Sequence, residues 1–188
     1  MIGRDIALHR WQHEEPLYVD DTAERREYIA DVVETYAPIS ASVLEIGCNA
    51  GSNLLALHRR GYSRLYGADP NWHALLEARR RVTLTAWYGD LAGLAGALTA
   101  VGPFDVVLTF ATLMHVHPDD DEAIGKIADF VGGHLITCEW EMSGNDYIEA
   151  RNYRDIFMPP LEQIEERIIA DVSGITGYTL RIFRRGGS

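Results

Sequence analysis

The expected fold follows from one stretch, residues 43–53, with the sequence Val43-Leu44-Glu45-Ile46-Gly47-Cys48-Asn49-Ala50-Gly51-Ser52-Asn53. An apolar strand leads into a turn that contains Gly47 and Gly51, and a helix leaves that turn. In open α/β sheets, ligands bind at the carboxyl ends of strands, where such turns lie. Glycines allow the backbone to bend sharply there and to approach a ligand closely. The stretch therefore predicts a ligand site at the end of the first strand.

The glycine spacing in this turn limits the kind of ligand. A dinucleotide-binding G-x-G-x-x-G pattern needs glycines at three positions where the chain has Gly47, Asn49 and Ser52. The chain also lacks the Gly-Lys-Ser/Thr sequence of a phosphate-binding Walker loop. We therefore expect a nucleoside-like ligand that carries no diphosphate.

Strand-like and helix-like segments alternate along the rest of the chain. The strands are short apolar runs, as expected where helices cover both faces of a parallel sheet. The last two runs are separated by a glycine-containing loop, which suits a hairpin. The sequence predicts an α/β fold: a Rossmann-like, doubly wound sheet, mostly parallel, with a C-terminal antiparallel hairpin and helices on both faces. The predicted strands are 42–46, 64–68, 82–88, 104–110, 134–140, 167–172 and 178–183; the predicted helices are 21–36, 52–60, 71–81, 91–98 and one that begins at Pro118.

The length and net charge of the chain limit the number of domains and the kinds of binding partner. A chain of 188 residues suits one domain, which we expect over residues 21–188, with residues 1–20 as an N-terminal arm or lid. The 17 basic and 28 acidic residues give a net charge of −11, which disfavours nonspecific binding to nucleic acid or to anionic membranes. Two distant cysteines, Cys48 and Cys138, show no metal-binding spacing. We expect a cytoplasmic protein without a structural metal, either a monomer or a homodimer.

The Glu45-x-Gly47-x-x-x-Gly51 pattern resembles motif I of the class I S-adenosylmethionine-dependent methyltransferases. Asp69, at the end of the second predicted strand, matches the acid that accepts hydrogen bonds from both ribose hydroxyls in that family. The resemblance covers about residues 40–185. It implies an enzyme whose cofactor is S-adenosyl-L-methionine and whose product is S-adenosyl-L-homocysteine.

Further segments match the family in the expected order. The resemblance implies that residues 89–91, Gly-Asp-Leu, line the adenine, and that residues 113–116 form the turn after the fourth strand. An aromatic ring suits the cationic sulfonium, which favours Phe110, and the indole of Trp72 is a candidate for packing on the adenine. The expected cofactor-binding residues are Glu45, Gly47, Asn49, Gly51, Asn53, Asp69, Pro70, Trp72, Gly89, Asp90, Leu91 and Phe110.

A closer resemblance concerns the acceptor side. Residues 44–49, residues 113–117, Glu139 and the Tyr153-Arg154-Asp155-x-Phe157 segment resemble small methylases associated with pseudaminic acid and surface-polysaccharide gene sets. This resemblance implies a sugar-like acceptor.

The catalytic candidate is His115, because an imidazole titrates near neutrality and is suited to act as a general base. The alternative is a structural histidine that is hydrogen-bonded in its turn. His115 and His117 precede three aspartates, but we interpret Pro118 and these acids as the start of a helix, not as a metal site. The acceptor-binding candidates are Trp11, Tyr18, His117, Glu139, Glu141, Tyr153 and Arg154.

These residues have alternative interpretations. Glu139 and Glu141 either bind sugar hydroxyls or an amine, or they belong to a solvated loop, and Arg154 either binds an anion or pairs with Asp155. For the whole chain, we expect methyl transfer to an oxygen or nitrogen of a small polar molecule, a sugar or a natural-product intermediate. The alternatives are a nicotinamide-dependent oxidoreductase and a catalytically silent S-adenosylmethionine-binding module. Nucleic acid is disfavoured as an acceptor by the charge and by the absence of an Asn/Asp-Pro-Pro-Tyr motif.

Overall fold

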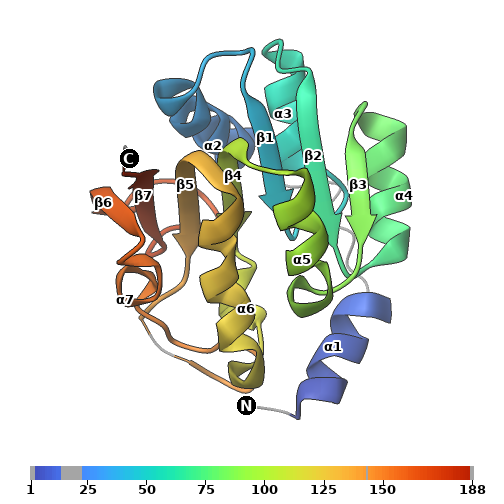
Figure 1. The fold of residues 1–188 in the computed structure, drawn as a ribbon, viewed down its shortest axis with the longest axis vertical. Helices are drawn as coiled ribbons and strands as arrows, with labels where there is room; N and C mark the ends of the chain where they lie inside the picture. Colours follow the sequence, from blue (N-terminus) through green and yellow to red (C-terminus); the bar gives the residue numbers. More distant parts are fainter. Residues whose placement is uncertain (1–2, 14–22, 143, 187–188) are drawn as a thin grey trace.

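The strands form a single twisted sheet in the computed structural model, which describes residues 3–13, 23–142 and 144–186 (Figure 1). In this part of the chain the strand order is β3-β2-β1-β4-β5-β7-β6. The first five strands are parallel, and β7 runs antiparallel to both β5 and β6. The predicted Rossmann-like sheet with its terminal hairpin is therefore confirmed. The strands are β1 Ser42–Ile46, β2 Arg64–Asp69, β3 Thr85–Tyr88, β4 Phe104–Phe110, β5 Val131–Glu139, β6 Leu161–Ile168 and β7 Thr179–Arg185.

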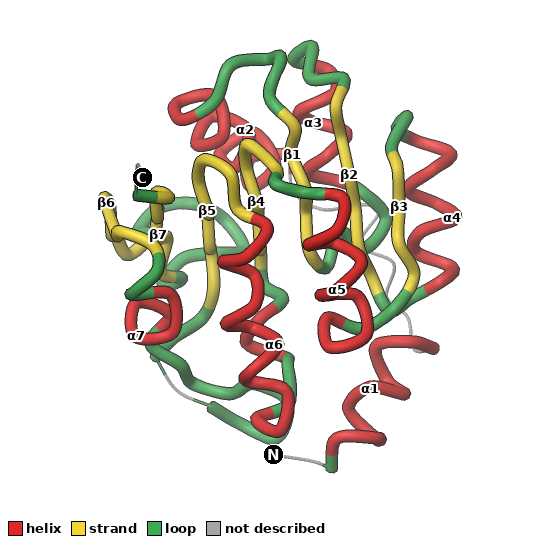
Figure 2. Tube along the Cα trace, in the orientation of Figure 1, coloured by secondary structure: helices red, strands yellow, loops and turns green. Residues whose placement is uncertain are grey.

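Helices cover both faces of the sheet, and each face has its own apolar core. One core joins the sheet to α2, α3 and α4, and the other joins it to α5, α6 and α7. Figure 2 shows α2 and α3 behind the strands and α5 and α6 in front of them. The helices are α1 Arg4–His13, α2 Ala23–Tyr36, α3 Ser52–Arg59, α4 Trp72–Arg81, α5 Leu91–Val101, α6 Asp121–Gly125 and α7 Tyr153–Phe157; short 3-10 turns span Leu113–His115, Pro118–Asp120 and Lys126–Phe130.

Local sequence explains where the elements that frame the ligand site begin. The side chain of Asn71 accepts a hydrogen bond from the Ala74 N–H at 3.1 Å and so caps α4, as predicted. The side chain of Asp90 caps α5 in the same way, with Gly93 N–H as the donor at 2.7 Å. Strand β4 is almost continuously apolar because both of its faces are covered.

The first strand of the terminal hairpin, β6, differs from the expectation. We predicted a strand at 167–172, but β6 occupies Leu161–Ile168. This is an edge strand with mostly charged and polar residues, a composition that protects an open sheet edge but weakens the apolar signal of a strand. Ile169, which contributed to the predicted strand, is instead buried in the loop that connects β6 to β7.

The first segment of the chain is more regular than expected. Residues 4–13 of the predicted arm form the helix α1, which lies at the carboxyl end of the sheet beyond α5 (Figure 1). Residues 14–22 lie outside the described part of the chain. No helix in the described part is both long enough and apolar enough to span a membrane.

Candidate active site

A cavity of about 320 Å³ lies at the carboxyl ends of the first four strands. Its walls are residues 46–49, 68–71, 89–92 and 110–112, which follow β1, β2, β3 and β4, together with one side of α1. Parallel strands bring these segments to one edge of the sheet, which is why distant motifs meet there. The predicted site residues that line the cavity are Trp11, Glu45, Gly47, Asn49, Asn53, Asp69, Pro70, Gly89, Asp90, Leu91, Phe110, His115 and His117.

The turn after β1 has an unusual backbone. Gly47, Asn49 and Gly51 have φ angles of 73°, 45° and 72°, in the left-handed region that favours glycine. A side chain at Gly47 would also collide with Thr112, since a Cβ built there lies 2.8 Å from the Cβ of Thr112. The turn therefore fits closely against the segment that follows β4.

The amides of this turn are already engaged. Each backbone N–H from residue 47 to residue 51 has an acceptor within the protein, at 2.7 to 3.1 Å. These bonds make the turn rigid, and they leave its N–H groups committed to internal acceptors. The acceptors are the carbonyl of Ala68 for both Gly47 and Cys48, Oδ2 of Asp69 for Asn49, Oδ1 of Asn49 for Ala50, and the carbonyl of Cys48 for Gly51.

Asp69 presents a fixed carboxylate to the cavity. It is only 7% exposed, and its two oxygens accept one hydrogen bond each, from the N–H groups of Asn49 and Asn71, both at 2.8 Å. Burial raises the pKa of Asp69 to about 6, while the two N–H donors act in the opposite direction. A carboxylate oxygen accepts more than one hydrogen bond, so each oxygen retains capacity for a ligand hydroxyl.

Glu45 and Asn53 form a buried polar pair on the cavity wall. The Asn53 Nδ2 donates to Oε1 of Glu45 at 2.6 Å. Within the described residues, the buried Oδ1 of Asn53 has no hydrogen-bond partner. A buried acceptor left in this way suits a donor from a bound ligand, such as an ammonium group.

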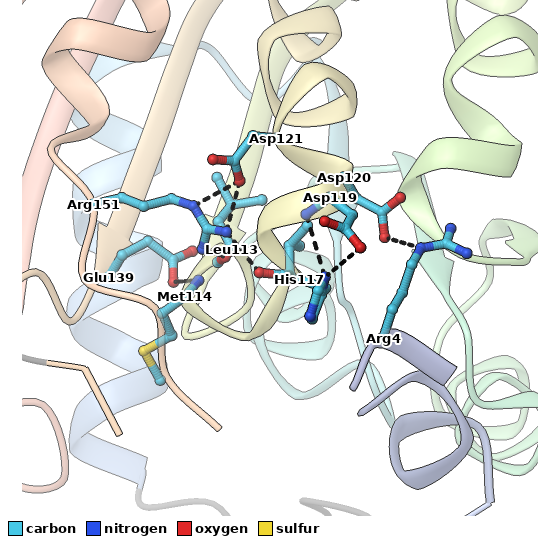
Figure 3. Close-up of polar contacts among 10 residues, drawn as sticks. Arg4, Leu113, Met114, His117, Asp119, Asp120, Asp121, Glu139 and Arg151 are labelled. Carbon is cyan, nitrogen blue, oxygen red and sulfur yellow. Dashed lines mark hydrogen bonds and ion pairs between the residues drawn. The ribbon is translucent and has the colours of Figure 1, made fainter. Parts of the chain in front are cut away.

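The opposite end of the cavity is tied to α1 by ion pairs. Arg4 Nε donates to Oδ2 of Asp120 at 2.7 Å, as Figure 3 shows, and Arg4 Nη2 lies 4.0 Å from Oδ2 of Asp90. Asp90 therefore caps α5 and also lies close to Arg4 of α1. Arg4 and Asp120 both line the cavity, and the sequence analysis did not identify them.

His115 is held in a defined tautomer. Its Nδ1 lies 2.8 Å from the carbonyl oxygen of Tyr147, and because a carbonyl only accepts, Nδ1 carries the hydrogen. Nε2 of the neutral ring is then an acceptor. Burial lowers the pKa of His115, with a smaller contribution from the Arg10 cation, which favours this neutral form at pH 7. The ring of Trp11 on α1 lies 4.4 Å from the His115 ring, centroid to centroid.

Glu139 fixes the turn that carries His115. The carboxylate is completely buried, and its Oε2 accepts from the N–H of Thr112 at 2.9 Å. It also accepts more weakly from the N–H of Met114 at 3.4 Å, the contact that Figure 3 shows. Burial raises its pKa to about 7. The described lining of the cavity does not include Glu139, so it lies behind the turn.

Arg151 fixes the same turn from the other side. Its guanidinium donates to the carbonyls of Leu113 and Val116 at 3.1 and 2.7 Å, and to Oδ1 of Asp121 at 2.6 and 3.0 Å (Figure 3). The residue is 7% exposed, so these bonds are largely shielded from water. Glu139 and Arg151 together make residues 112–116 a preorganised segment.

The other predicted acceptor-binding residues lie elsewhere. Both oxygens of Glu141 bond to Arg181 at 2.8 Å, which occupies that carboxylate. Tyr153 is fully buried and Arg154 is exposed, and neither is in the described cavity lining. Tyr18 lies outside the described residues.

Two predicted cofactor residues, Gly51 and Trp72, also lie outside the described cavity lining. A third residue, His117, lines the cavity but has a structural hydrogen bond. Gly51 shapes the turn through its positive φ, and Trp72 is 45% exposed with its ring edge-on to Tyr88 at 5.7 Å. His117 lines the cavity, but its Nδ1 accepts from the Asp119 N–H at 3.2 Å and caps the 3-10 turn that follows. In the described part of the chain, no group of three or more His, Cys, Asp or Glu side chains is arranged to hold a metal ion.

Residues 43–132 match the model of a protein family described as a methyltransferase domain. Over these residues the chain is similar to that methyltransferase family, and its fold is that of the class I S-adenosylmethionine-dependent methyltransferases. This similarity favours methyl transfer over the nicotinamide-dependent oxidoreductase that we kept as an alternative. No curated protein matches the chain in sequence.

Solved structures share the fold over most of their length. Magnesium protoporphyrin IX methyltransferase from Synechocystis PCC 6803 with bound SAH aligns with a TM-score of 0.70 and 16% identity, over 97% of this chain and 93% of that chain. The N-methyltransferase NodS from Bradyrhizobium japonicum WM9 aligns with a TM-score of 0.67 and 20% identity, over 90% of this chain and 100% of that chain. A TehB-like SAM-dependent methyltransferase from Corynebacterium glutamicum ATCC 13032 Kitasato aligns with a TM-score of 0.64 and 18% identity, over 84% of this chain and 86% of that chain. At these identities the likeness shows the fold.

Proposed function

We propose that the cavity binds S-adenosylmethionine and that the enzyme transfers a methyl group to an oxygen or nitrogen of a small polar molecule. The observation that carries the proposal is the meeting of Asp69, the turn after β1 and Asp90 around one cavity that also reaches His115. A nucleoside needs a carboxylate for its ribose hydroxyls and a polar partner for its base, and the cavity supplies both. The neutral His115 supplies a base at the other end.

Each wall of the cavity has a role in this proposal. Asp69 accepts the ribose hydroxyls, Asp90 and Leu91 contact the adenine, and the buried Oδ1 of Asn53 accepts from the ammonium group. When bound, the cofactor supplies an electrophilic methyl group on a sulfonium. Phe110 lies at the end of β4, where its ring tolerates a cation.

His115 is the proposed general base. Its Nε2 accepts the proton of an acceptor hydroxyl as the new bond forms, and the imidazolium is stabilised by the Nδ1–H bond to the carbonyl of Tyr147. Trp11 and α1 exclude water from this end of the cavity. Because residues 112–116 are held from two sides, the base is positioned before the acceptor binds.

The identity of the methyl acceptor is a more specific proposal. The titles of two fold relatives name a magnesium protoporphyrin methyltransferase and an N-methyltransferase, so this fold accommodates acceptors of different chemistry. We propose a sugar or natural-product intermediate, in keeping with the closer resemblance noted in the sequence. We place the reaction in the cytoplasm, in keeping with the free, buried Cys48 and Cys138.

Calorimetric titration of the full chain with S-adenosylmethionine, S-adenosylhomocysteine and NAD tests the cofactor. We expect saturable binding of the first two ligands and no heat of binding with NAD. A preference for NAD, or no binding of either adenosyl compound, would refute the proposal. An acceptor screen that measures released S-adenosylhomocysteine then separates an active enzyme from a silent binding module.

A His115→Asn variant tests the base. The asparagine Nδ2 keeps a donor for the Tyr147 carbonyl but offers no group that takes a proton at neutral pH. We expect the affinity for S-adenosylhomocysteine to stay within about two-fold and the turnover of the acceptor found in the screen to fall by about 100-fold or more. His58→Asn is the matched control, since His58 is an exposed histidine of α3 outside the described cavity lining. Unchanged turnover in His115→Asn would remove the residue from the mechanism.

A further inference from the structure

The cavity has apolar and aromatic neighbours around His115. Leu8 and Trp11 of α1 line the cavity, as do Met114 and Val116, which flank His115 in the turn after β4. The centroids of the Trp11 and His115 rings are 4.4 Å apart. An acceptor atom that bonds to Nε2 of His115 lies within about 3 Å of that nitrogen, so the body of the acceptor lies beside the indole.

The sequence of α1 explains which of its side chains line the cavity. Arg4, Leu8 and Trp11 are spaced by four and three residues, which places them on one face of the helix, whereas Ile6 is 66% exposed. The bond from Arg4 to Asp120 holds the start of this face at the α5 end of the cavity. Trp11 follows Arg4 by seven residues, about 10 Å along the helix axis. The apolar part of the face therefore lies at the other end, with the proposed base.

The carboxylates that we expected to bind sugar hydroxyls have other partners. Glu139 accepts hydrogen bonds from the N–H groups of the turn after β4. Both oxygens of Glu141 bond to Arg181. A sugar carries a hydroxyl on nearly every carbon, and each hydroxyl that is buried needs a polar partner. The described lining beside Trp11 is better suited to an apolar ring with a single reacting hydroxyl.

The state of His115 favours an acidic hydroxyl independently of the apolar lining. Its Nδ1–H bonds to the Tyr147 carbonyl, which leaves Nε2 as the proton acceptor, and burial lowers the pKa of His115. A base with a lowered pKa takes a proton more readily from a more acidic group. A phenol has a pKa of about 10, whereas an aliphatic hydroxyl is about as weakly acidic as water, with a pKa of about 16. This imidazole is therefore better matched to a phenol than to a sugar hydroxyl.

We propose that the methyl acceptor is a phenol and that Trp11 is the specificity-determining residue that binds its aromatic ring. The inference rests on the proposed function and selects an aromatic natural-product intermediate over a sugar. The ring packs against the indole with its hydroxyl at Nε2 of His115. The phenol oxygen forms a bond to the methyl carbon as the sulfur–methyl bond breaks, the electron pair of that bond stays on sulfur, and the hydroxyl proton moves to Nε2. The products are an aryl methyl ether and S-adenosylhomocysteine.

Turnover of defined acceptors by the full chain tests the class of acceptor. The probe 4-(2-hydroxyethyl)phenol carries a phenolic and an aliphatic hydroxyl on one ring, and we expect methylation of the phenolic oxygen, identified by mass spectrometry. Phenol and catechol are the further aromatic probes, and methyl β-D-glucopyranoside is the sugar probe. We expect the sugar to release S-adenosylhomocysteine about 100-fold more slowly than the phenols, or slower still. Methylation of the aliphatic hydroxyl, faster turnover of the sugar, or no turnover of any of the three phenols would overturn the inference.

Substitutions of Trp11 test the contact with the ring. For Trp11→Ala we expect the KM for the phenol to rise about 10-fold or more, with a smaller change in kcat. Trp11→Phe keeps an aromatic ring and should recover most of the loss. Ile6→Ala is the matched control, because Ile6 is an exposed residue of the same helix outside the described cavity lining, and it should leave the KM unchanged. An unchanged KM in Trp11→Ala would remove this residue from acceptor binding.

Calorimetry with S-adenosylhomocysteine separates the two levels of the proposal. The affinity should stay within about two-fold of the wild type in Trp11→Ala, Trp11→Phe and Ile6→Ala, because these changes lie away from Asp69 and the turn after β1. A failure of the proposed function would appear as the absence of binding by the wild type. A failure of the present inference would appear as retained binding with methylation of the sugar, or with the phenols unmethylated.

Discussion

An Asp69→Ala variant will lose about 100-fold or more of its affinity for S-adenosylhomocysteine. The carboxylate is the proposed acceptor for two ribose hydroxyls, and it also holds the N–H groups of Asn49 and Asn71 at 2.8 Å. Alanine removes all of these acceptors from a buried site. Calorimetry measures the loss, and thermal unfolding shows that the fold is retained. Asp31→Ala, which removes an exposed carboxylate of α2, is the control.

Undiminished binding by Asp69→Ala would contradict the ribose role. The pH dependence of binding provides a second test. The pKa of Asp69 is about 6, and the ionised form is the better acceptor, so protonation removes acceptor capacity. We expect the affinity to be constant above pH 7 and to fall below pH 6, by at most about tenfold per pH unit. In Asp69→Asn the affinity should be low at every pH and lack this dependence.

The raised pKa of Asp69 also predicts how stability depends on pH. Stability should fall as the pH rises, whereas the affinity for the cofactor should increase. Asp69 has a pKa of 3.8 as a model carboxyl and about 6 in the folded protein, so between these values the folded state binds more protons than the unfolded state. Stability therefore falls as pH rises from about 4 to about 6, and above this range the ionised carboxylate disfavours folding by about 3 kcal/mol. Asp69→Asn should weaken binding, and its stability should lack the decrease between pH 4 and pH 6 that the wild type shows. Such a result would show that the buried acid is retained for its ligand and not for stability.

The part of the site that lies on the strand ends was predictable from the sequence. Asp69 and Asp90 each follow a short apolar strand, and parallel strands end at one edge of a sheet, so the order of motifs along the chain fixes their proximity. The capping roles of Asn71 and Asp90 follow from local hydrogen bonding within a few residues. These features depend on short-range chemistry and on the period of the strands, which a single sequence records.

The remainder depends on contacts between distant segments. Arg25 lies in a helix before β1, and no local motif marks it as a cavity residue. Glu139 was expected in contact with the acceptor, but the end of β5 places it behind residues 112–116 as an anchor for their N–H groups. Glu141 is likewise bonded to Arg181 on the terminal hairpin, a partner 40 residues away along the chain. Spacing along the sequence does not determine which of several distant partners a charged side chain meets.

A Gly47→Ala variant should abolish measurable cofactor binding and lower the free energy of unfolding by about 3 kcal/mol or more. Two effects add. The φ of 73° is unfavourable for a residue with a side chain, and the new methyl group overlaps Thr112, whose Cβ lies 2.8 Å from the position of an added Cβ. Thr112 is not free to move, because its N–H donates to Glu139 at 2.9 Å and its hydroxyl donates to the Phe110 carbonyl at 3.0 Å.

Gly61→Ala separates these two effects. Gly61 has a φ of +99°, and an added Cβ there meets no atom within 4 Å, so its substitution carries backbone strain alone, about 1 kcal/mol. The double variant Gly47→Ala/Thr112→Gly removes the overlap and should recover the stability that exceeds this strain. If Gly47→Ala costs no more than Gly61→Ala in urea denaturation, the overlap with Thr112 is not significant. A large excess cost, recovered in the double variant, would mean that Gly47 is required because the turn after β1 and the segment that carries His115 approach more closely than any side chain permits.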